Sequence, residues 1–126
     1  MTSEAVNHAL EVMDRHINAL NASDNEALIS TLHFPQFRLN GTQLKTWESS
    51  EHYLTDFLQR AGSDWCYSRF EDIQVLQASD DKVHLDAKIC RYRSNHSLIT
   101  TFRSLWVITK VNGHWAAKFR SSFASI

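Results

Sequence analysis

Two residues of opposite charge in the C-terminal half are the first candidates for chemistry. Asp72 and Arg91 fall diagonally across one predicted strand pair, on the side expected to face inward. Arg91 could bind a carboxylate ligand through its planar guanidinium, and a buried Asp72 could act as a general base. The alternative is an ion pair at the rim of the sheet, which is the usual way for such charges to persist in a core.

Histidines offer a second route to acid–base chemistry. His33 lies between a predicted short helix and Pro35, where its imidazole could contact a ligand or move a proton. It has no carboxylate nearby to orient it, so a hydrogen-bonded structural histidine is the alternative. His84 and Asp86 share one face of a predicted strand, but they are expected to point outward among basic side chains. A surface charge network is the better interpretation of that pair.

The sequence lacks the motifs of metal and nucleotide sites. The histidines, cysteines and acids do not show metal-ligand spacing. Neither a glycine-rich phosphate loop nor a G-x-S-x-G motif occurs. We therefore expect no metal and no cofactor.

Charge and hydropathy argue against two further kinds of partner. The chain has 13 basic and 14 acidic residues, a net charge of −1 and no basic stripe, so a nucleic-acid partner is not expected. Its apolar runs are far shorter than the ~20 residues that span a bilayer, so we expect no membrane partner. The first residues do not resemble a signal peptide, and we expect a cytoplasmic protein.

The elements that must position these residues form a helical half followed by a strand half. Apolar residues at helical spacing predict a first helix, whose stripe consists of Val6, Leu10, Met13, Ile17 and Leu20. A second, short helix ends before Pro35, and a third ends at Gly62. Between them, Asn40-Gly41 predicts a hairpin.

From residue 65 onward the apolar residues alternate, which predicts strands over 65–78, 82–93, 98–111 and 114–124. The turns between them are short, so the strands should form an antiparallel meander. We predict a single α+β domain over residues 1–126. Three helices would pack on a strongly curved antiparallel sheet, made of four long strands and the short hairpin, and enclose an internal pocket.

The turns also predict which side chains share the inner face of the sheet. Residues that flank a two-residue turn pair with each other, and paired residues point to the same side. Counting outward from the turns at 80–81, 95–96 and 112–113 gives three central rows: Leu76–Leu85–Trp106–Phe119, Gln74–Ala87–Ser104–Ser121 and Asp72–Ile89–Phe102–Phe123. A β-bulge would shift part of this register.

The small polar row of this face could leave room for a ligand, gripped by the aromatic residues of the rows beside it. The predicted ligand-binding residues are Gln74, Arg91, Phe102, Ser104, Trp106, Phe119 and Ser121. The alternative is that helix side chains fill the space and satisfy the hydroxyl groups.

The predicted outer face carries an apolar strip surrounded by charge. Leu105 and Val107 lie on one strand, with Ile73 and Val75 on another. This pattern suggests a homodimer interface with a polar rim. The alternative is a scatter of surface aliphatic residues, which is common.

Four short segments accompany this order of elements: 19–24 (ALNASD), 27–28 (AL), 106–109 (WVIT) and 112–115 (NGHW). Together with that order they resemble the nuclear transport factor 2-like superfamily over nearly the whole chain. This superfamily includes ketosteroid isomerase, scytalone dehydratase and polyketide cyclases. The resemblance implies a cone-shaped fold, a cavity between the concave face of the sheet and the helices, and often a homodimer through the outer sheet face.

The catalytic groups of these enzymes do not transfer to this sequence. Relatives of ketosteroid isomerase place a catalytic carboxylate on the first strand, where this chain reads FRLNG over residues 37–41, without an acid. Scytalone dehydratase-like chemistry needs a His–Asp pair in the cavity, and no such pair can be placed.

Three functions remain open from the sequence. The first is a small-molecule-binding protein whose pocket is apolar, lined by aromatic residues and polar at one end. The second is a cofactor-independent isomerase, cyclase or dehydratase acting on a small hydrophobic substrate, with Asp72 or His33 as acid–base. The third is a dimeric scaffold without a ligand.

Overall fold

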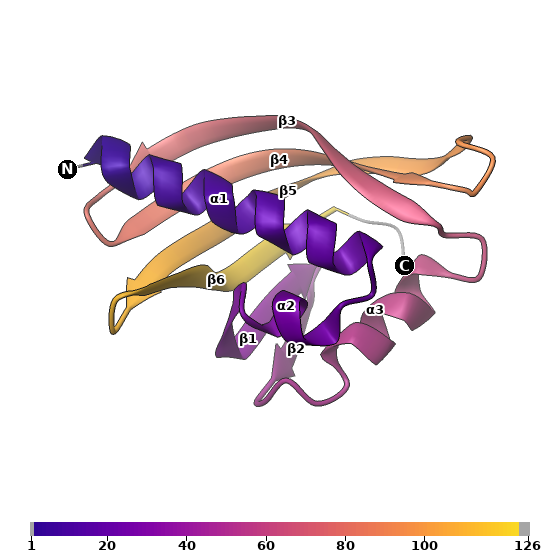
Figure 1. Cartoon of the computed structure of the whole chain (residues 1–126), viewed down its shortest axis with the longest axis horizontal. Helices are drawn as coiled ribbons and strands as arrows, with labels where there is room; N and C mark the ends of the chain where they lie inside the picture. The colour runs from indigo at the N-terminus through magenta and orange to yellow at the C-terminus, as the bar shows by residue number, and fades with distance from the viewer. Residues whose placement is uncertain (1, 124–126) are drawn as a thin grey trace.

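A computed structural model describes residues 2–123 as one curved sheet with a long helix across one face (Figure 1). The elements in chain order are α1 (Thr2–Asn21), α2 (Asn25–Ile29), β1 (Leu32–Asn40), β2 (Gln43–Trp47), α3 (Tyr53–Ala61), β3 (Tyr67–Ala78), β4 (Lys82–Tyr92), β5 (Leu98–Val111) and β6 (His114–Ser122). The predicted α+β class and all four long strands are confirmed. None of the described helices is long and apolar enough to cross a membrane.

The six strands follow the order β2-β1-β6-β5-β4-β3. All neighbours are antiparallel except β1 and β6, which run parallel. This parallel pairing brings the N-terminal hairpin beside the last strand of the chain. The hairpin loop consists of residues 41–42, one position later than predicted, because Asn40 still pairs with Gln43. Gly41 suits this loop because its φ of 58° is unfavourable for other residues.

The buried side of helix α1 overlaps its predicted apolar stripe but is rotated from it. Of that stripe, Leu10 is exposed, whereas Met13 and Leu20 are buried. The buried residues of α1 are Ala5, Ala9, Val12, Met13, His16, Ala19 and Leu20. Alanines let the helix approach the sheet closely, which places the His16 ring 5.0 Å from the ring of Trp106.

The predicted register between β4 and β5 is correct along the inner face. Leu85 pairs with Trp106, Ala87 with Ser104, and Ile89 with Phe102. Since Leu85, Ala87, Ser104 and Trp106 are all buried, these two strands form the centre of the concave wall.

The predicted register of β3 is wrong in its central part. Irregularities between Phe70 and Asp72 and between Val75 and Gln77 shift the pairing. Asp72 pairs with Lys88 and Gln74 with Asp86, so both side chains lie on the outer face, while Ile73 lies inward and packs against the core. The bulges exchange two polar side chains for apolar ones on the side of the sheet that faces α1.

The predicted register of β6 is wrong beyond residue 117. Ala117 pairs with Ile108 as predicted, but an irregularity follows, after which Arg120 pairs with Trp106. Phe119 and Ser121 therefore point outward, whereas Arg120 and Ser122 are buried on the inner face. This outcome opposes hydrophobic patterning, since the bulge turns a phenylalanine out and an arginine in. Bulges often re-aim a side chain beside a functional site.

Candidate functional site

The concave interior contains some of the predicted site residues and not others. Arg91, Ser104 and Trp106 are buried on the inner face, and Phe102 is half-buried against the core. The four residues that the irregularities in β3 and β6 turn outward do not line this interior: Asp72, Gln74, Phe119 and Ser121. The predicted contact between Asp72 and Arg91 is therefore wrong.

On the outer face, Asp72 belongs to a charge network centred on Arg103. The Arg103 guanidinium lies 3.2 Å from Asp72 Oδ2 and 2.9 Å from Asp86 Oδ2. Gln74 Nε2 donates to Asp72 Oδ2 over 3.2 Å. The hydrogen bond from Arg103 to Asp86 and, to a lesser extent, the one to Asp72 raise the pKa of Arg103. The surface charge network predicted around Asp86 is present, and it accounts for Asp72 as well.

His33 takes the structural role that was the alternative for it. Its Nε2–H donates to the carbonyl oxygen of Thr109 over 3.0 Å, and its ring lies edge-on to that of His114 at 5.7 Å. It is not among the residues that line the interior cavity.

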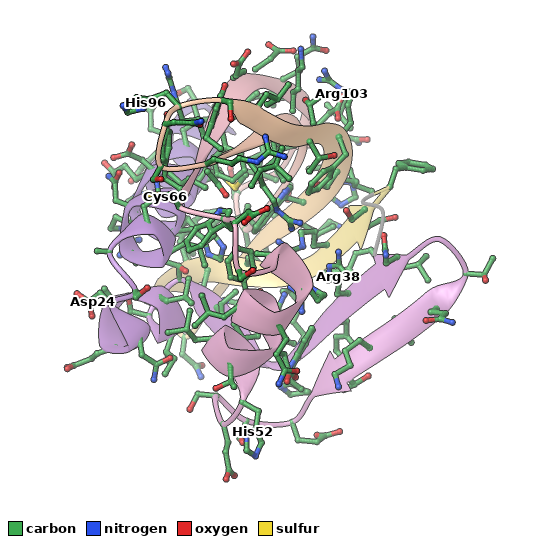
Figure 2. All side chains as sticks on the ribbon, turned by 90° about the vertical axis from the view of Figure 1, so that its right-hand side faces the viewer. Asp24, Arg38, His52, Cys66, His96 and Arg103 are labelled. Carbon is green, nitrogen blue, oxygen red and sulfur yellow. The ribbon has the colours of Figure 1, made fainter. Side chains whose placement is uncertain are left out.

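Four arginines converge on the interior, and three of them are almost completely buried. Arg38 of β1, Arg91 of β4 and Arg120 of β6 retain 5%, 6% and 7% of their exposure. Arg38 and Arg120 are direct partners across the parallel pair of strands. Arg60 joins them from α3, and Figure 2 shows Arg38 beside this helix, far from Arg103. We call these four residues the arginine cluster.

No carboxylate within residues 2–123 forms an ion pair with the arginine cluster; the ion pairs seen there involve other residues. Burial lowers the pKa of Arg38 to about 9, with contributions from Arg120, Arg60 and Arg91. Burial and the charge of Arg120 lower the pKa of Arg60 and of Arg91 to about 10. All remain charged at neutral pH, so the fold holds mutually repelling cations out of water. Each such ion costs several kcal/mol when no anion compensates it.

The same region concentrates hydrogen-bond donors that have no partner in the described chain. The buried side-chain atoms without a partner are Arg38 Nε, Asn40 Oδ1, Arg60 Nε and Nη2, Arg91 Nε, Ser104 Oγ, Trp106 Nε1 and Thr109 Oγ1. Most are N–H groups, which can only donate. A native core rarely leaves such groups unpaired. Apart from Asn40 Oδ1, which itself accepts, these groups can all donate and lack an acceptor. A negatively charged oxygen is the strongest acceptor for an arginine.

Aromatic rings hold the guanidiniums in place without neutralising them. The Arg91 guanidinium lies 4.9 Å from the ring centre of Phe102 and 5.5 Å from that of Phe57. Arg120 lies 5.0 Å from the ring centre of Trp106. Contacts of this kind contribute ~0.5–2 kcal/mol each, less than the cost of burying the charges. They orient the Arg91 and Arg120 guanidiniums within the interior.

The arginine cluster lies between two spaces. An open groove of about 430 Å³ runs between the β1–β2 hairpin and α3; its lining includes Arg38, Asn40, Trp47, Gln59 and Arg60. An enclosed cavity of about 20 Å³ lies deeper, with Arg91 and Arg120 in its wall. A cavity of that size holds about one water molecule. Of the two spaces, only the groove is large enough to admit a small molecule.

Besides the two arginines, His16 is the titratable residue that lines the enclosed cavity. The Thr31 hydroxyl donates to the Leu28 carbonyl oxygen over 2.6 Å, so it accepts from His16 Nδ1–H over 2.9 Å. Burial, and to a lesser extent Arg120, lowers the pKa of His16 to about 3. The imidazole is thus neutral near pH 7, and it fills the cavity wall without supplying charge.

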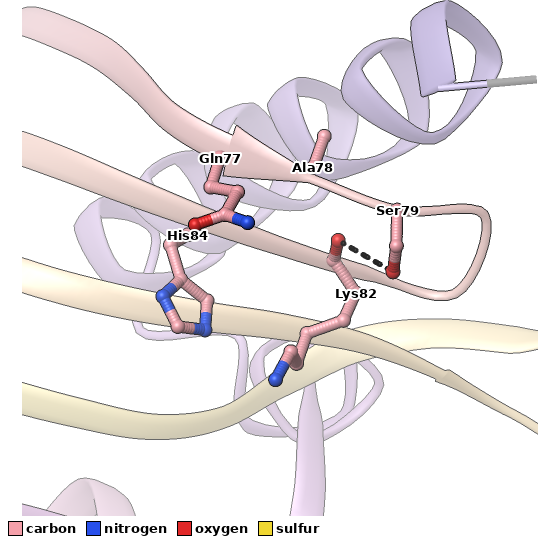
Figure 3. Close-up of a pocket in the computed structure, with 5 residues that line it drawn as sticks. All are labelled: Gln77, Ala78, Ser79, Lys82 and His84. Carbon is pink, nitrogen blue, oxygen red and sulfur yellow. Dashed lines mark hydrogen bonds between the residues drawn. The ribbon is translucent and has the colours of Figure 1, made fainter.

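A separate recess on the outer face carries no comparable chemistry. It has a volume of about 120 Å³ and is lined by Gln77, Ala78, Ser79, Lys82 and His84 (Figure 3). The Ser79 hydroxyl donates to Asp81 Oδ1 over 3.1 Å and lies 3.4 Å from the Lys82 carbonyl oxygen, so it is already engaged. Within residues 2–123, no group of three or more histidine, cysteine or acidic side chains could hold a metal ion.

Sequence reasoning identified Arg91 but missed the other three arginines. Arg120 was expected on the outer face because the predicted register contains no bulge. Arg38 stands between Phe37 and Leu39, and hydrophobic alternation would turn it outward, yet it is buried and both neighbours are half-exposed. For Arg38 and Arg120, the signal that could have found them is the absence of an acid nearby in sequence; Arg60 lacks this signal, since Asp56 and Asp64 lie four residues to either side.

Comparison of the sequence with models of known protein families finds no match, and comparison with curated proteins finds none either. Solved structures do match. A protein of unknown function with a cystatin-like fold from Nostoc punctiforme has a TM-score of 0.80 at 12% identity, over 99% of this chain and 94% of that one. An NTF2-like protein from Cytophaga hutchinsonii has a TM-score of 0.72 at 20% identity, over 99% and 100% of the two chains.

An NTF2-like protein with a cystatin-like fold from Novosphingobium aromaticivorans has a TM-score of 0.77 at 16% identity, over 95% of this chain and 81% of that one. Identities this low establish the fold and carry no site residues across. The α+β order, the curved six-stranded sheet and these matches agree. The chain therefore has the nuclear transport factor 2-like fold that its sequence resembles.

Proposed function

We propose that this protein binds a small anionic molecule in the interior of its cone, held by the arginine cluster. The observation that carries the proposal is the burial of Arg38, Arg91 and Arg120 without a carboxylate partner in the described chain. An oxyanion would neutralise the repulsion among the guanidiniums and accept hydrogen bonds from the unpaired Nε–H groups. The proposal includes the pocket predicted from the sequence and gives it a cationic polar end that extends beyond Arg91.

Binding without acid–base catalysis is the function that this arrangement favours. The candidate acid–base residues, Asp72 and His33, are engaged outside the enclosed cavity. His16, which does line the cavity, has its pKa lowered to about 3 by burial and is a poor base at neutral pH. The arginines remain protonated and bind, orient or polarise an anion rather than move a proton.

The direct test of this proposal is calorimetric titration with succinate, a small dianion. The Arg91→Gln variant should bind it ~10- to 100-fold more weakly than the wild type, since a hydrogen bond to a charged group contributes ~1.5–3 kcal/mol. Arg103→Gln, which removes an arginine from the outer face, is the matched control and should leave the affinity unchanged. Equal weakening in both variants would indicate long-range charge attraction and would refute the proposed site.

The outer face of the sheet supports a homodimer as the assembled form. Four half-buried apolar side chains lie next to one another on its three central strands: Phe37 of β1, Phe119 of β6, and Leu105 and Val107 of β5. Lys118 lies 5.2 Å from the ring centre of Phe37, and the Arg103 network borders the opposite side. An apolar centre with a charged rim is typical of protein interfaces.

Changing Leu105 to aspartate should abolish this dimer without unfolding the monomer, because it places a charge at the centre of the proposed interface. Sedimentation velocity measures the change: the wild type should sediment as a dimer and the variant as a monomer. Lys110→Asp, which also introduces an aspartate on an exposed part of the same strand and changes the charge by one unit more, is the control. A wild type that stays monomeric at high concentration would contradict the proposed homodimer.

A further inference from the structure

The arginine cluster is divided into two pairs that face different spaces. Arg38 and Arg60 line the open groove, and Arg91 and Arg120 line the enclosed cavity. We propose that the ligand is a dicarboxylate, with one carboxylate bound by the Arg38/Arg60 pair and the other by the Arg91/Arg120 pair. This inference rests on the proposed function and specifies the class of ligand for the same site.

The inner pair suits a carboxylate better than a larger oxyanion. Its cavity of about 20 Å³, which holds about one water molecule, is walled by Phe57, Ile89 and Trp106, so it has room for one carboxylate oxygen and not for a tetrahedral phosphate. A planar carboxylate matches the planar guanidinium and can accept two parallel hydrogen bonds. The buried, unpaired Arg91 Nε–H is available as a donor to such a group. Trp106 Nε1–H, also unpaired, belongs to the same wall.

The outer pair has room for the second carboxylate and for the body of the ligand. Arg38 Nε and two nitrogens of Arg60 have no hydrogen-bond partner within the described chain. The one carboxylate that lines this groove, Asp56, accepts from Trp47 Nε1 over 2.9 Å and lies 3.7 Å from Lys45 Nζ. Asp56 is therefore engaged at the rim, and its charge raises the pKa of Arg60 only against the larger effect of burial, so it compensates the outer pair in part.

The positive charges of the two pairs repel one another. An anion bound to one pair alone therefore leaves the charge of the other pair uncompensated. The charge of Arg120 lowers the pKa of Arg38, Arg60 and Arg91, which belong to both pairs, although burial is the larger cause for each. Phe57 joins the pairs physically, since its ring lies 5.8 Å from the Arg60 guanidinium and 5.5 Å from that of Arg91. A single carboxylate cannot offset four cations, whereas a molecule with two carboxylates could place one at each pair.

Graded acids test the inference on the unmodified protein by calorimetric titration. Succinate, glutarate and adipate are compared with their monoamides, which have the same length and one charge fewer. One of the diacids should bind at least ~10-fold more tightly than its monoamide, because only the diacid engages both pairs. A preferred chain length is also expected, since the two pairs have fixed positions.

Variants of each pair locate the two carboxylates. Arg60→Gln in the outer pair and Arg91→Gln in the inner pair should each reduce the affinity for the diacid to about that for the monoamide. Only one of the two variants should also bind the monoamide more weakly. Arg103→Gln is the control with unchanged affinity. Thermal unfolding of each variant confirms that it is folded, and the comparison of acids with monoamides needs no variant.

The outcomes separate this inference from the function on which it rests. If diacids and monoamides bind equally and both depend on the arginines, the anion site stands and the dicarboxylate assignment is overturned. Tighter binding of 3-phosphonopropionate than of succinate would also overturn it, in favour of a phosphorylated acid. If none of these anions binds the wild type, the proposed function itself fails.

Discussion

Replacing Arg38 by methionine is expected to stabilise the protein in the absence of ligand and to abolish anion binding. Arg38 is 5% exposed, its Nε–H has no partner, and burial together with three other arginines lowers its pKa to about 9. A depressed arginine pKa means that the charged form is disfavoured in the folded state, so removing the charge favours folding at neutral pH. Methionine keeps most of the side-chain length. Replacing buried ionic groups by well-packed apolar ones can stabilise by ~1–4 kcal/mol.

Urea unfolding at pH 7 and low salt measures the change in the free energy of unfolding. The matched control is Arg103→Met on the outer face, where the expected sign is opposite. That change breaks contacts with Asp72 and Asp86 and should lower stability. If Arg38→Met instead lowered the stability of the ligand-free protein, Arg38 would have a stabilising partner, and the account of an uncompensated cluster would be wrong.

The stability of the wild-type protein should fall as the pH is lowered below about 6.5, chiefly through His16. Burial, with Arg120 as a second cause, lowers the pKa of His16 to about 3. The unfolded chain takes up a proton near pH 6.5 while the folded chain does not, so stability is full above pH 6.5 and is lost as the pH falls toward 3. Between pH 6.5 and 5 this loss should reach ~2 kcal/mol.

The variant His16→Gln removes the titrating group and is the control for this prediction. Its stability will be lower overall, because the change disturbs the bond to Thr31 and the contact with Trp106. The decisive quantity is the slope of unfolding free energy against pH between 7.5 and 5, measured with urea. This slope should be clearly smaller in the variant. An identical slope in both proteins would mean that other groups cause the pH dependence.

The elements of this fold could be predicted from sequence because their signals are local. Pro35 and Gly62 limit helices, and the short turns define the strands. The register between β4 and β5 was also predictable. Its one irregularity lies beside Tyr92, close to the turn at 95–96, and the pairing from Arg91 to Leu85 is regular. The parallel pairing of β1 with β6 joins distant parts of the chain and has no local signal.

The site was only partly predictable because it depends on bulges. The bulges of β3 turn Asp72 and Gln74 outward, and the irregularity in β6 turns Arg120 inward. A single extra residue reverses every side chain beyond it, and hydrophobic alternation does not reveal where that residue lies. In β6 the structure even opposes the pattern, with Phe119 outside and Arg120 inside. Such local violations of patterning are expected where function requires them.

The central claim is that the interior binds an oxyanion through its charge, and succinate compared with succinamide on the wild-type protein tests it most directly. The two molecules have nearly the same size and shape, but only succinate carries negative charge. Isothermal titration at pH 7 and low salt should show saturable binding of succinate to one site per chain and no measurable binding of succinamide. Equal binding of both molecules, or of neither, would contradict the account.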